Sequence, residues 1–201
     1  KSIELMRRDI DDWRITFVNT GRDANIGERL LAVRPHLEGE EIFLANYADV
    51  LTDAPLPRLL ETFHARGKTA LFLAARPSQS FHVMSIGDDD LVAAIEPASR
   101  ADLWVNGGFF VLSRGIFDVM RPGDELVEAP FQRLIARGQL TAYRHEGFWM
   151  GVDTFKERHQ LDELYARGAA PWAVWERRPE TSSAHAGEPH ASARVATLGR
   201  S

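Results

Sequence analysis

Asp49 and Asp153 are the two carboxylates in this sequence whose surroundings suit metal or phosphate chemistry. Asp49 follows the apolar run 41–46, which has the length and composition of a buried strand. Ligands of parallel α/β sheets bind at the carboxyl ends of strands, and Mg²⁺ takes one or two carboxylates together with substrate phosphates. The competing interpretation is that Asp49 only caps the next turn, as Asp often does. Asp53, in the same turn, is a second candidate for the metal.

Asp153 stands near the end of the segment 147–154, which reads GFWMGVDT and directly precedes a helical pattern. Asp is a favoured residue at the N-cap of a helix. An N-cap and a metal ligand are compatible roles for one carboxylate, so both stay open for Asp153.

A pair of glycines interrupts the β-rich run 105–112. Gly107 and Gly108 follow Asn106, and glycine inside a strand marks a bulge or a close approach by a ligand or by backbone. Asn106 could hydrogen-bond a sugar hydroxyl or its own turn. Glu96 could accept hydrogen bonds from hydroxyls, although a lone Glu is more often solvated.

Composition narrows the classes of function. The chain has 201 residues, of which 44% are hydrophobic and 26% charged, and its net charge is −5. Its scattered basic residues tell against nucleic-acid binding. The absence of cysteine excludes disulfides, zinc–thiolate sites and cysteine nucleophiles, and no apolar run has the roughly 20 residues of a membrane span. A small-molecule enzyme or an interaction domain in the cytoplasm is expected, with His145 at its surface.

The elements that must position these residues follow from hydrophobic periodicity. Strands are predicted at 13–18, 41–46, 69–75, 81–86, 105–112 and 140–145, and helices at 25–37, 56–67, 114–120, 126–137 and 154–167. This alternation predicts an α/β fold with a mostly parallel sheet and helices on both faces. The composition changes near residue 178, which predicts one domain over 1–178 and a disordered tail over 179–201.

Four short stretches agree in order and spacing with the motifs of one family. They read FVNTG with GERL at 17–21 and 27–30, YADV with Asp53 at 47–53, VNGGFFVL at 105–112, and EGFW to VDT followed by PWAVW at 146–154 and 171–175. In these stretches the chain resembles the sugar-phosphate nucleotidyltransferases, and the glucose-1-phosphate cytidylyltransferases among them. The resemblance covers about residues 13–176.

The resemblance implies a Rossmann-like nucleotidyltransferase fold and transfer of a cytidylyl group from CTP to a sugar 1-phosphate, for polysaccharide biosynthesis. It implies catalytic roles for Asp49 and Asp153 as ligands of Mg²⁺, nucleotide contacts by Arg29 and Tyr47, and substrate contacts by Glu96, Asn106 and Gly107. The implied partners are small molecules, namely a nucleoside triphosphate and a sugar 1-phosphate, with no nucleic acid and no membrane. Self-association into a homo-oligomer is left open.

The family also begins with a glycine-rich loop that binds the triphosphate, and a lysine follows its sugar-site glutamate. This sequence shows no such loop. Pro97 follows Glu96, so the lysine has no counterpart at that position, and Arg100 is the residue that could replace it. We therefore expect an N-terminally incomplete nucleotidyltransferase with little turnover by itself. The alternative is a non-catalytic sugar-nucleotide-binding or assembly module with the same fold.

Overall fold

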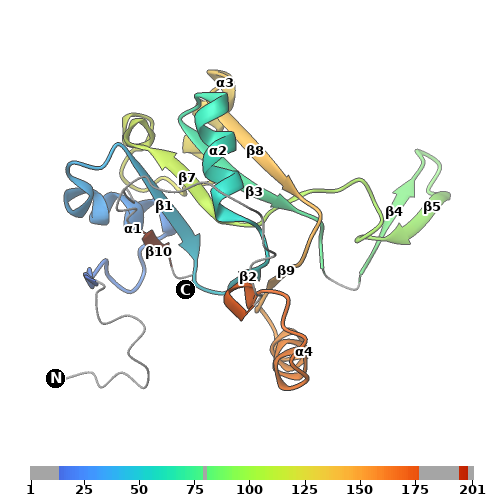
Figure 1. The fold of residues 1–201 in the computed structure, drawn as a ribbon. Helices are drawn as coiled ribbons and strands as arrows, with labels where there is room; N and C mark the ends of the chain where they lie inside the picture. The colour runs from blue at the N-terminus through green and yellow to red at the C-terminus, as the bar shows by residue number, and fades with distance from the viewer. Residues whose placement is uncertain (1–13, 79–80, 177–194, 199–201) are drawn as a thin grey trace.

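A central mixed sheet carries the fold (Figure 1). The computed structural model describes residues 14–78, 81–176 and 195–198. The strands of the central sheet are β1 (Ile42–Tyr47), β3 (Ala70–Ala75), β6 (Val105–Asn106), β7 (Phe110–Ser113), β8 (Leu140–His145) and β10 (Val195–Leu198). Across the sheet the order is β10, β1, β7, β3 and β8. β6 and β7 pair with the same edge of β3, β7 with Ala70 and Leu71 and β6 with Ala74 and Ala75, while β8 pairs with the other edge.

The strand directions differ from the prediction. β7 is antiparallel to both β1 and β3, and β6 is antiparallel to β3. Among the described strands of this sheet, only the β3–β8 and β1–β10 pairs are parallel. The expected mostly parallel sheet is therefore wrong, although the α/β class is confirmed. The physical reason is that a strand buried on both faces has the same apolar pattern in either direction.

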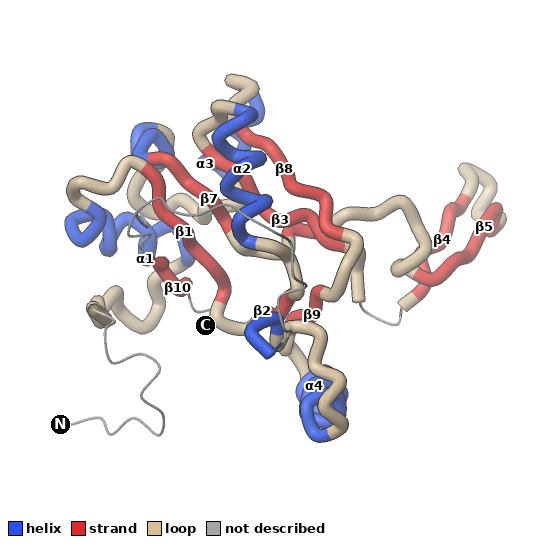
Figure 2. The backbone as a smooth tube through the Cα atoms, in the orientation of Figure 1, coloured by secondary structure: helices blue, strands red, loops and turns tan. Residues whose placement is uncertain are grey.

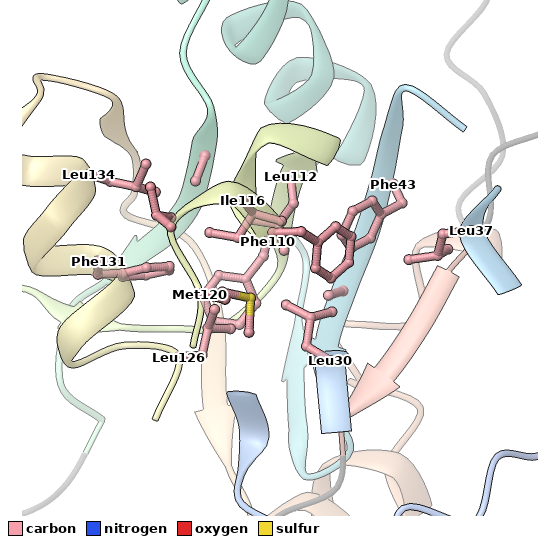
Figure 3. Packing of buried hydrophobic residues seen from close by; sticks show 14 of the residues in the cluster. Leu30, Leu37, Phe43, Phe110, Leu112, Ile116, Met120, Leu126, Phe131 and Leu134 are labelled. Atoms are coloured by element: carbon pink, nitrogen blue, oxygen red, sulfur yellow. The ribbon is translucent and has the colours of Figure 1, made fainter. Parts of the chain in front are cut away.

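Helices cover both faces of the sheet, as predicted. On one face, Phe43, Ala70 and Phe110 pack against α1 (Ile26–Val33), η1 (Arg34–Leu37), η2 (Arg114–Asp118) and α3 (Ala129–Ala136). Figure 3 shows Leu30 of α1 and Phe131 of α3 on this face, close to Phe110. Burial of one such side chain stabilises the fold by about 1.5–3 kcal/mol.

The opposite face is covered by α2 (Leu56–Arg66). Leu59 and Phe63 lie four residues apart, hence on one stripe of the helix, and pack against Leu71 and Val111 of the sheet. Gly67 ends α2 in the left-handed conformation, with φ of 57°, which glycine adopts without strain.

Two small ladders lie outside the central sheet (Figure 2). β2 (Val50–Thr52) pairs with β9 (Trp149–Gly151), and β4 (His82–Ile86) pairs with β5 (Val92–Pro97); both pairs are antiparallel. The β4–β5 hairpin projects from the body of the molecule (Figure 1). Neither β2, β5 nor β9 was predicted, because β2 and β9 have only three residues each and β5 is exposed along most of its length.

The remaining predicted elements agree with the structure within a few residues, including α4 (Phe155–Ala166), with two exceptions. Residues 14–18 form no regular element, and Phe17 is 81% exposed, so the strand predicted at 13–18 is wrong over these residues. The predicted tail at 179–201 lies outside the described residues, except for β10, which forms a strand beside β1. Within the described part of the chain, no helix is long and apolar enough to cross a membrane.

Candidate active site

The short β2–β9 ladder brings Asp49 and Asp153 to one place. Asp49 immediately precedes β2, and its carbonyl accepts a hydrogen bond of 2.8 Å from the N–H of Val152. Val50 pairs with Gly151. Asp49, which precedes β2, and Asp153, which follows β9, therefore lie at the same end of the ladder, although they are 104 positions apart in the printed sequence. Both line a cavity of about 170 Å³, whose other lining residues are Tyr47, Val50, Val105, Asn106, Trp149 and Gly151. Asp49 and Asp153 therefore line the same cavity.

The side chain of Asp49 is only half-buried, but its Oδ1 atom is fully buried and accepts no hydrogen bond from any described residue. A buried carboxylate oxygen without a partner is costly in free energy. A carboxylate oxygen is also the ligand type that Mg²⁺ prefers. The atom is thus placed to receive a cation or a donor from a ligand, and the interpretation of Asp49 as a mere cap does not explain it.

Asp153 is not the N-cap of α4. That position belongs to Thr154, whose hydroxyl accepts from the N–H of Glu157 while the Glu157 carboxylate accepts from the N–H of Thr154. The Asp153 N–H also donates to Glu157, at 2.9 Å. Since this capping box satisfies the helix end without the Asp153 side chain, the N-cap prediction for Asp153 is wrong, and its carboxylate lines the cavity instead.

Asn106 lines the cavity, and the two glycines that follow it lie outside the lining but contact its residues. The Asn106 amide donates to the Tyr47 hydroxyl at 3.0 Å, and its Oδ1 accepts from the N–H of Gly108 at 3.0 Å. The Trp149 indole N–H donates to the carbonyl of Gly107 at 2.9 Å. A Cβ atom on Gly107 would lie 2.9 Å from that indole nitrogen, so the backbone needs glycine for packing here. Trp149 itself lines the cavity.

Asp53 has a structural role. Its Oδ1 accepts from the N–H of Phe148 at 2.8 Å and lies 2.9 Å from Nε2 of His145. His145 is 8% exposed, so its expected surface position is wrong. Because both hydrogen bonds fasten the turn before β9, Asp53 positions the ladder and is not a cavity residue.

Three predicted site residues, Gly107, Arg29 and Glu96, lie outside the lining of this cavity. Arg29, on α1, donates from Nε to the carbonyl of Ala24 at 2.8 Å. Glu96 is exposed on β5 in the projecting hairpin (Figure 1). The structure therefore brings Tyr47, Asp49, Asn106 and Asp153 to one cavity and leaves Gly107, Arg29 and Glu96 outside its lining.

The carboxylates of Asp49 and Asp153 suit a cation that takes its remaining ligands from the substrate. Among the described residues, no group of three or more His, Cys, Asp or Glu could hold a metal by itself. Two carboxylates without a third are what Mg²⁺ uses when substrate phosphates complete its ligands. The cavity is also smaller than the roughly 300–1,000 Å³ of a whole small-molecule site, which suits one end of a substrate.

Comparisons with known proteins identify the family of the chain. No protein-family model matches the chain. A glucose-1-phosphate cytidylyltransferase from Salmonella typhimurium is 30% identical over 175 residues, which are 87% of this chain and 68% of the relative. The chain belongs to the glucose-1-phosphate cytidylyltransferase family.

Further relatives support the family assignment. A "Probable glucose-1-phosphate cytidylyltransferase" from Bacillus subtilis is 31% identical over 167 residues, covering 82% of this chain and 65% of the relative. A crystal structure described as a "Putative Glucose-1-Phosphate Thymidylyltransferase" from Bacillus anthracis, in complex with a sucrose, matches with a TM-score of 0.52 at 15% identity. That match covers 72% of this chain and 62% of the other and supports the nucleotidyltransferase fold. The chain spans about two thirds of the length of the curated relatives that it matches.

Proposed function

We propose that this protein transfers a nucleotidyl group, cytidylyl from CTP, to a sugar 1-phosphate, with glucose 1-phosphate as the first substrate to test. The observation that carries the proposal is the cavity that joins the buried, unpartnered Oδ1 of Asp49 to Asp153, Tyr47 and Asn106. Family membership supports the same reaction, because the relatives carry that activity in their names.

The chemistry needs positioning more than acid–base catalysis. A phosphate monoester is largely doubly ionised near neutral pH, since its second pKa is about 6. An oxygen of the sugar phosphate therefore attacks the α-phosphorus of the triphosphate without a general base. The new P–O bond joins the two substrates, the bond between the α-phosphorus and its bridging oxygen breaks, and pyrophosphate leaves with the electron pair.

Asp49 and Asp153 would hold Mg²⁺ at the β2–β9 ladder. When bound there, the ion offsets phosphate charge, which the two carboxylates by themselves would repel. The Asn106 amide, held between Tyr47 and Gly108, presents a fixed polar edge to a sugar hydroxyl. Nucleotide contacts by Arg29 and sugar contacts by Glu96 remain predictions, as do a cytoplasmic location, polysaccharide biosynthesis and self-association.

The test is pyrophosphate release from CTP and glucose 1-phosphate with Mg²⁺, by the protein expressed from its complete reading frame and by the 201-residue chain. We expect turnover by the complete protein, and a loss of at least about 100-fold in Asp49→Asn and in Asp153→Asn, the range seen when one charge-stabilising group is removed. UTP and dTTP in parallel assays identify the preferred base.

Asp162→Asn is the matched control, because Asp162 is an exposed carboxylate on α4 that only faces Arg158 at 3.7 Å. Its turnover should equal that of the unsubstituted protein. Unchanged turnover in Asp49→Asn would overturn the proposed site. Binding of CDP-glucose without any pyrophosphate release would favour the non-catalytic module.

A further inference from the structure

Two guanidinium groups share one indole ring at the carboxyl end of β3. The Cζ atom of Arg76 lies 4.1 Å from the ring centroid of Trp104, and that of Arg144 lies 5.5 Å from it. Indole is the strongest aromatic partner for a cation. A guanidinium that packs on a ring keeps N–H donors at its edge, where they can bind a carboxylate or phosphate. We call these three residues the Arg–Trp cluster.

The two arginines differ in how far their donors are satisfied. Nη1 of Arg76 donates to the carbonyls of Ala101 and Leu103 and to Asp102, at 3.1–3.2 Å. Arg76 therefore fastens the loop before β6. Arg144 is exposed on β8 and makes no side-chain hydrogen bond or ion pair with any described residue. Two cations with one carboxylate leave a local positive charge, which favours an anion beside Arg144.

The sheet register places this charge beside the candidate active site. Ala74 on β3 pairs with Asn106 on one side and with Arg144 on the other. Directly paired residues point to the same face of a sheet, and neighbouring strands are about 4.8 Å apart. The Cα atom of Arg144 thus lies about 10 Å from that of Asn106, on the same face of the sheet, with Ala74 on the strand between them. The Arg–Trp cluster and Asn106 can contact one ligand.

We infer that Arg144, held against Trp104, binds the phosphate group of the sugar 1-phosphate. That the ligand contains a sugar rests on the proposed function. That it contains a phosphate is inferred from the Arg–Trp cluster. Asn106 offers neutral polar atoms that suit sugar hydroxyls, whereas Asp49 and Asp153 repel phosphate unless a cation lies between. Arg144 supplies a fixed positive charge without any metal. Binding of the sugar phosphate through Arg144 is therefore independent of Mg²⁺.

The test is isothermal titration of the 201-residue chain with glucose 1-phosphate, glucose, CTP and inorganic phosphate, in EDTA and without a second substrate. We expect glucose 1-phosphate to bind about tenfold or more tightly than glucose, as for a charge-assisted hydrogen-bonding contact. Arg144→Gln removes this difference, Arg144→Lys keeps part of it, and inorganic phosphate competes. Arg137→Gln, which removes an exposed arginine beyond the opposite end of β8, leaves the affinity unchanged.

Each contrary outcome has a defined meaning. Equal affinity of Arg144→Gln and the unsubstituted chain for glucose 1-phosphate would overturn the inference, as would no detectable binding by the unsubstituted chain. A loss confined to CTP would assign Arg144 to the nucleotide and also overturn it. Because no turnover is measured, a failure of nucleotidyl transfer in the activity assay leaves this result standing, and the two proposals fail separately.

Discussion

At the scale of single residues, Asp49 and Asp53 show how the same side chain takes opposite roles within one turn. Asp53 accepts from Phe148 N–H and lies within hydrogen-bond distance of His145, which stabilises the turn that precedes β9. Asp49 buries one oxygen without a partner. Within the fold, a structural carboxylate such as that of Asp53 has its hydrogen-bond partners. The unpartnered oxygen of Asp49 instead destabilises the ligand-free protein, and a bound ligand can offset that cost.

Asp49→Asn is therefore expected to raise the thermal stability of the metal-free protein, by about 1 kcal/mol, because an uncharged amide is less costly to bury than a carboxylate. Thermal melts measure this effect. Mg²⁺ with CTP should raise the melting temperature of the unsubstituted protein and leave that of Asp49→Asn unchanged. A variant that melts lower and still responds to Mg²⁺ would contradict the role assigned to Asp49.

At the scale of elements, the loop 121–126 docks on the N-terminus of α1, the helix that carries Arg29. Asn25 caps this helix and also donates to the carbonyl of Gly123 at 3.2 Å, and Ile26 N–H donates to Glu125. A Cβ atom on Gly27 would overlap the carbonyl oxygen of Asp124. Only glycine allows this contact between helix and loop, which gives a packing reason for Gly27 in the GERL stretch.

Gly27→Ala should destabilise the protein by about 1–3 kcal/mol, the usual cost of overpacking, in spite of the better helix propensity of Ala. Urea denaturation measures the difference. Gly115→Ala is the matched control, because its Cβ atom would meet neighbours at an ordinary 3.4 Å. Equal effects of the two substitutions would show that the loop moves away from α1 at little cost.

The same loop is joined to α3 by an ion pair between Asp124 and Arg133. The hydrogen bond from the Arg133 guanidinium holds the pKa of Asp124 below its ordinary value of 3.8, against the opposing effect of burial. A lowered folded-state pKa means that the contribution to stability is complete above pH 3.8 and is lost as the pH falls through the folded-state value.

Asp124→Asn should thus lower the urea midpoint by a constant amount between about pH 7 and 5, and by less as the pH drops below 3.8. Midpoints at several pH values test this, with Asp162→Asn on the exposed face of α4 as the control. A difference that grows on acidification would contradict the assigned sign.

At the scale of the whole molecule, the packed sheet and the β4–β5 hairpin differ in how they are stabilised. The central strands are covered by helices on both faces. The hairpin projects from the body (Figure 2). Its apolar residues are largely exposed: Met84, Ile86, Val92 and Ile95 are each more than half accessible. A two-stranded hairpin without a packed face is marginally stable in water.

Hydrogen exchange read by mass spectrometry should therefore show fast exchange for peptides from 82–97 and slow exchange for peptides from β3 and β7. Ligands that bind at the cavity should protect β2 and β9 and leave 82–97 unchanged, because Glu96 lies outside the cavity lining. Protection of the hairpin by glucose 1-phosphate would instead bring Glu96 into the sugar site.

The sequence by itself determined the α/β class, the helices over both faces and most element positions, because hydrophobic periodicity and caps act over short stretches of chain. It also determined the candidate carboxylates Asp49 and Asp153, through local motifs. Strand direction was not determined, since β7 has the same apolar pattern whether it runs parallel or antiparallel.

Only the tertiary structure decided which candidates share a site. The β2–β9 ladder, three residues on each side, is too short to show a period in the sequence, yet it brings Asp49 to Asp153. The pairing of Asp53 with His145 and of Arg144 with Trp104 likewise joins residues 92 and 40 positions apart in the printed sequence. Such contacts depend on the register of strands across the sheet, which no local pattern specifies.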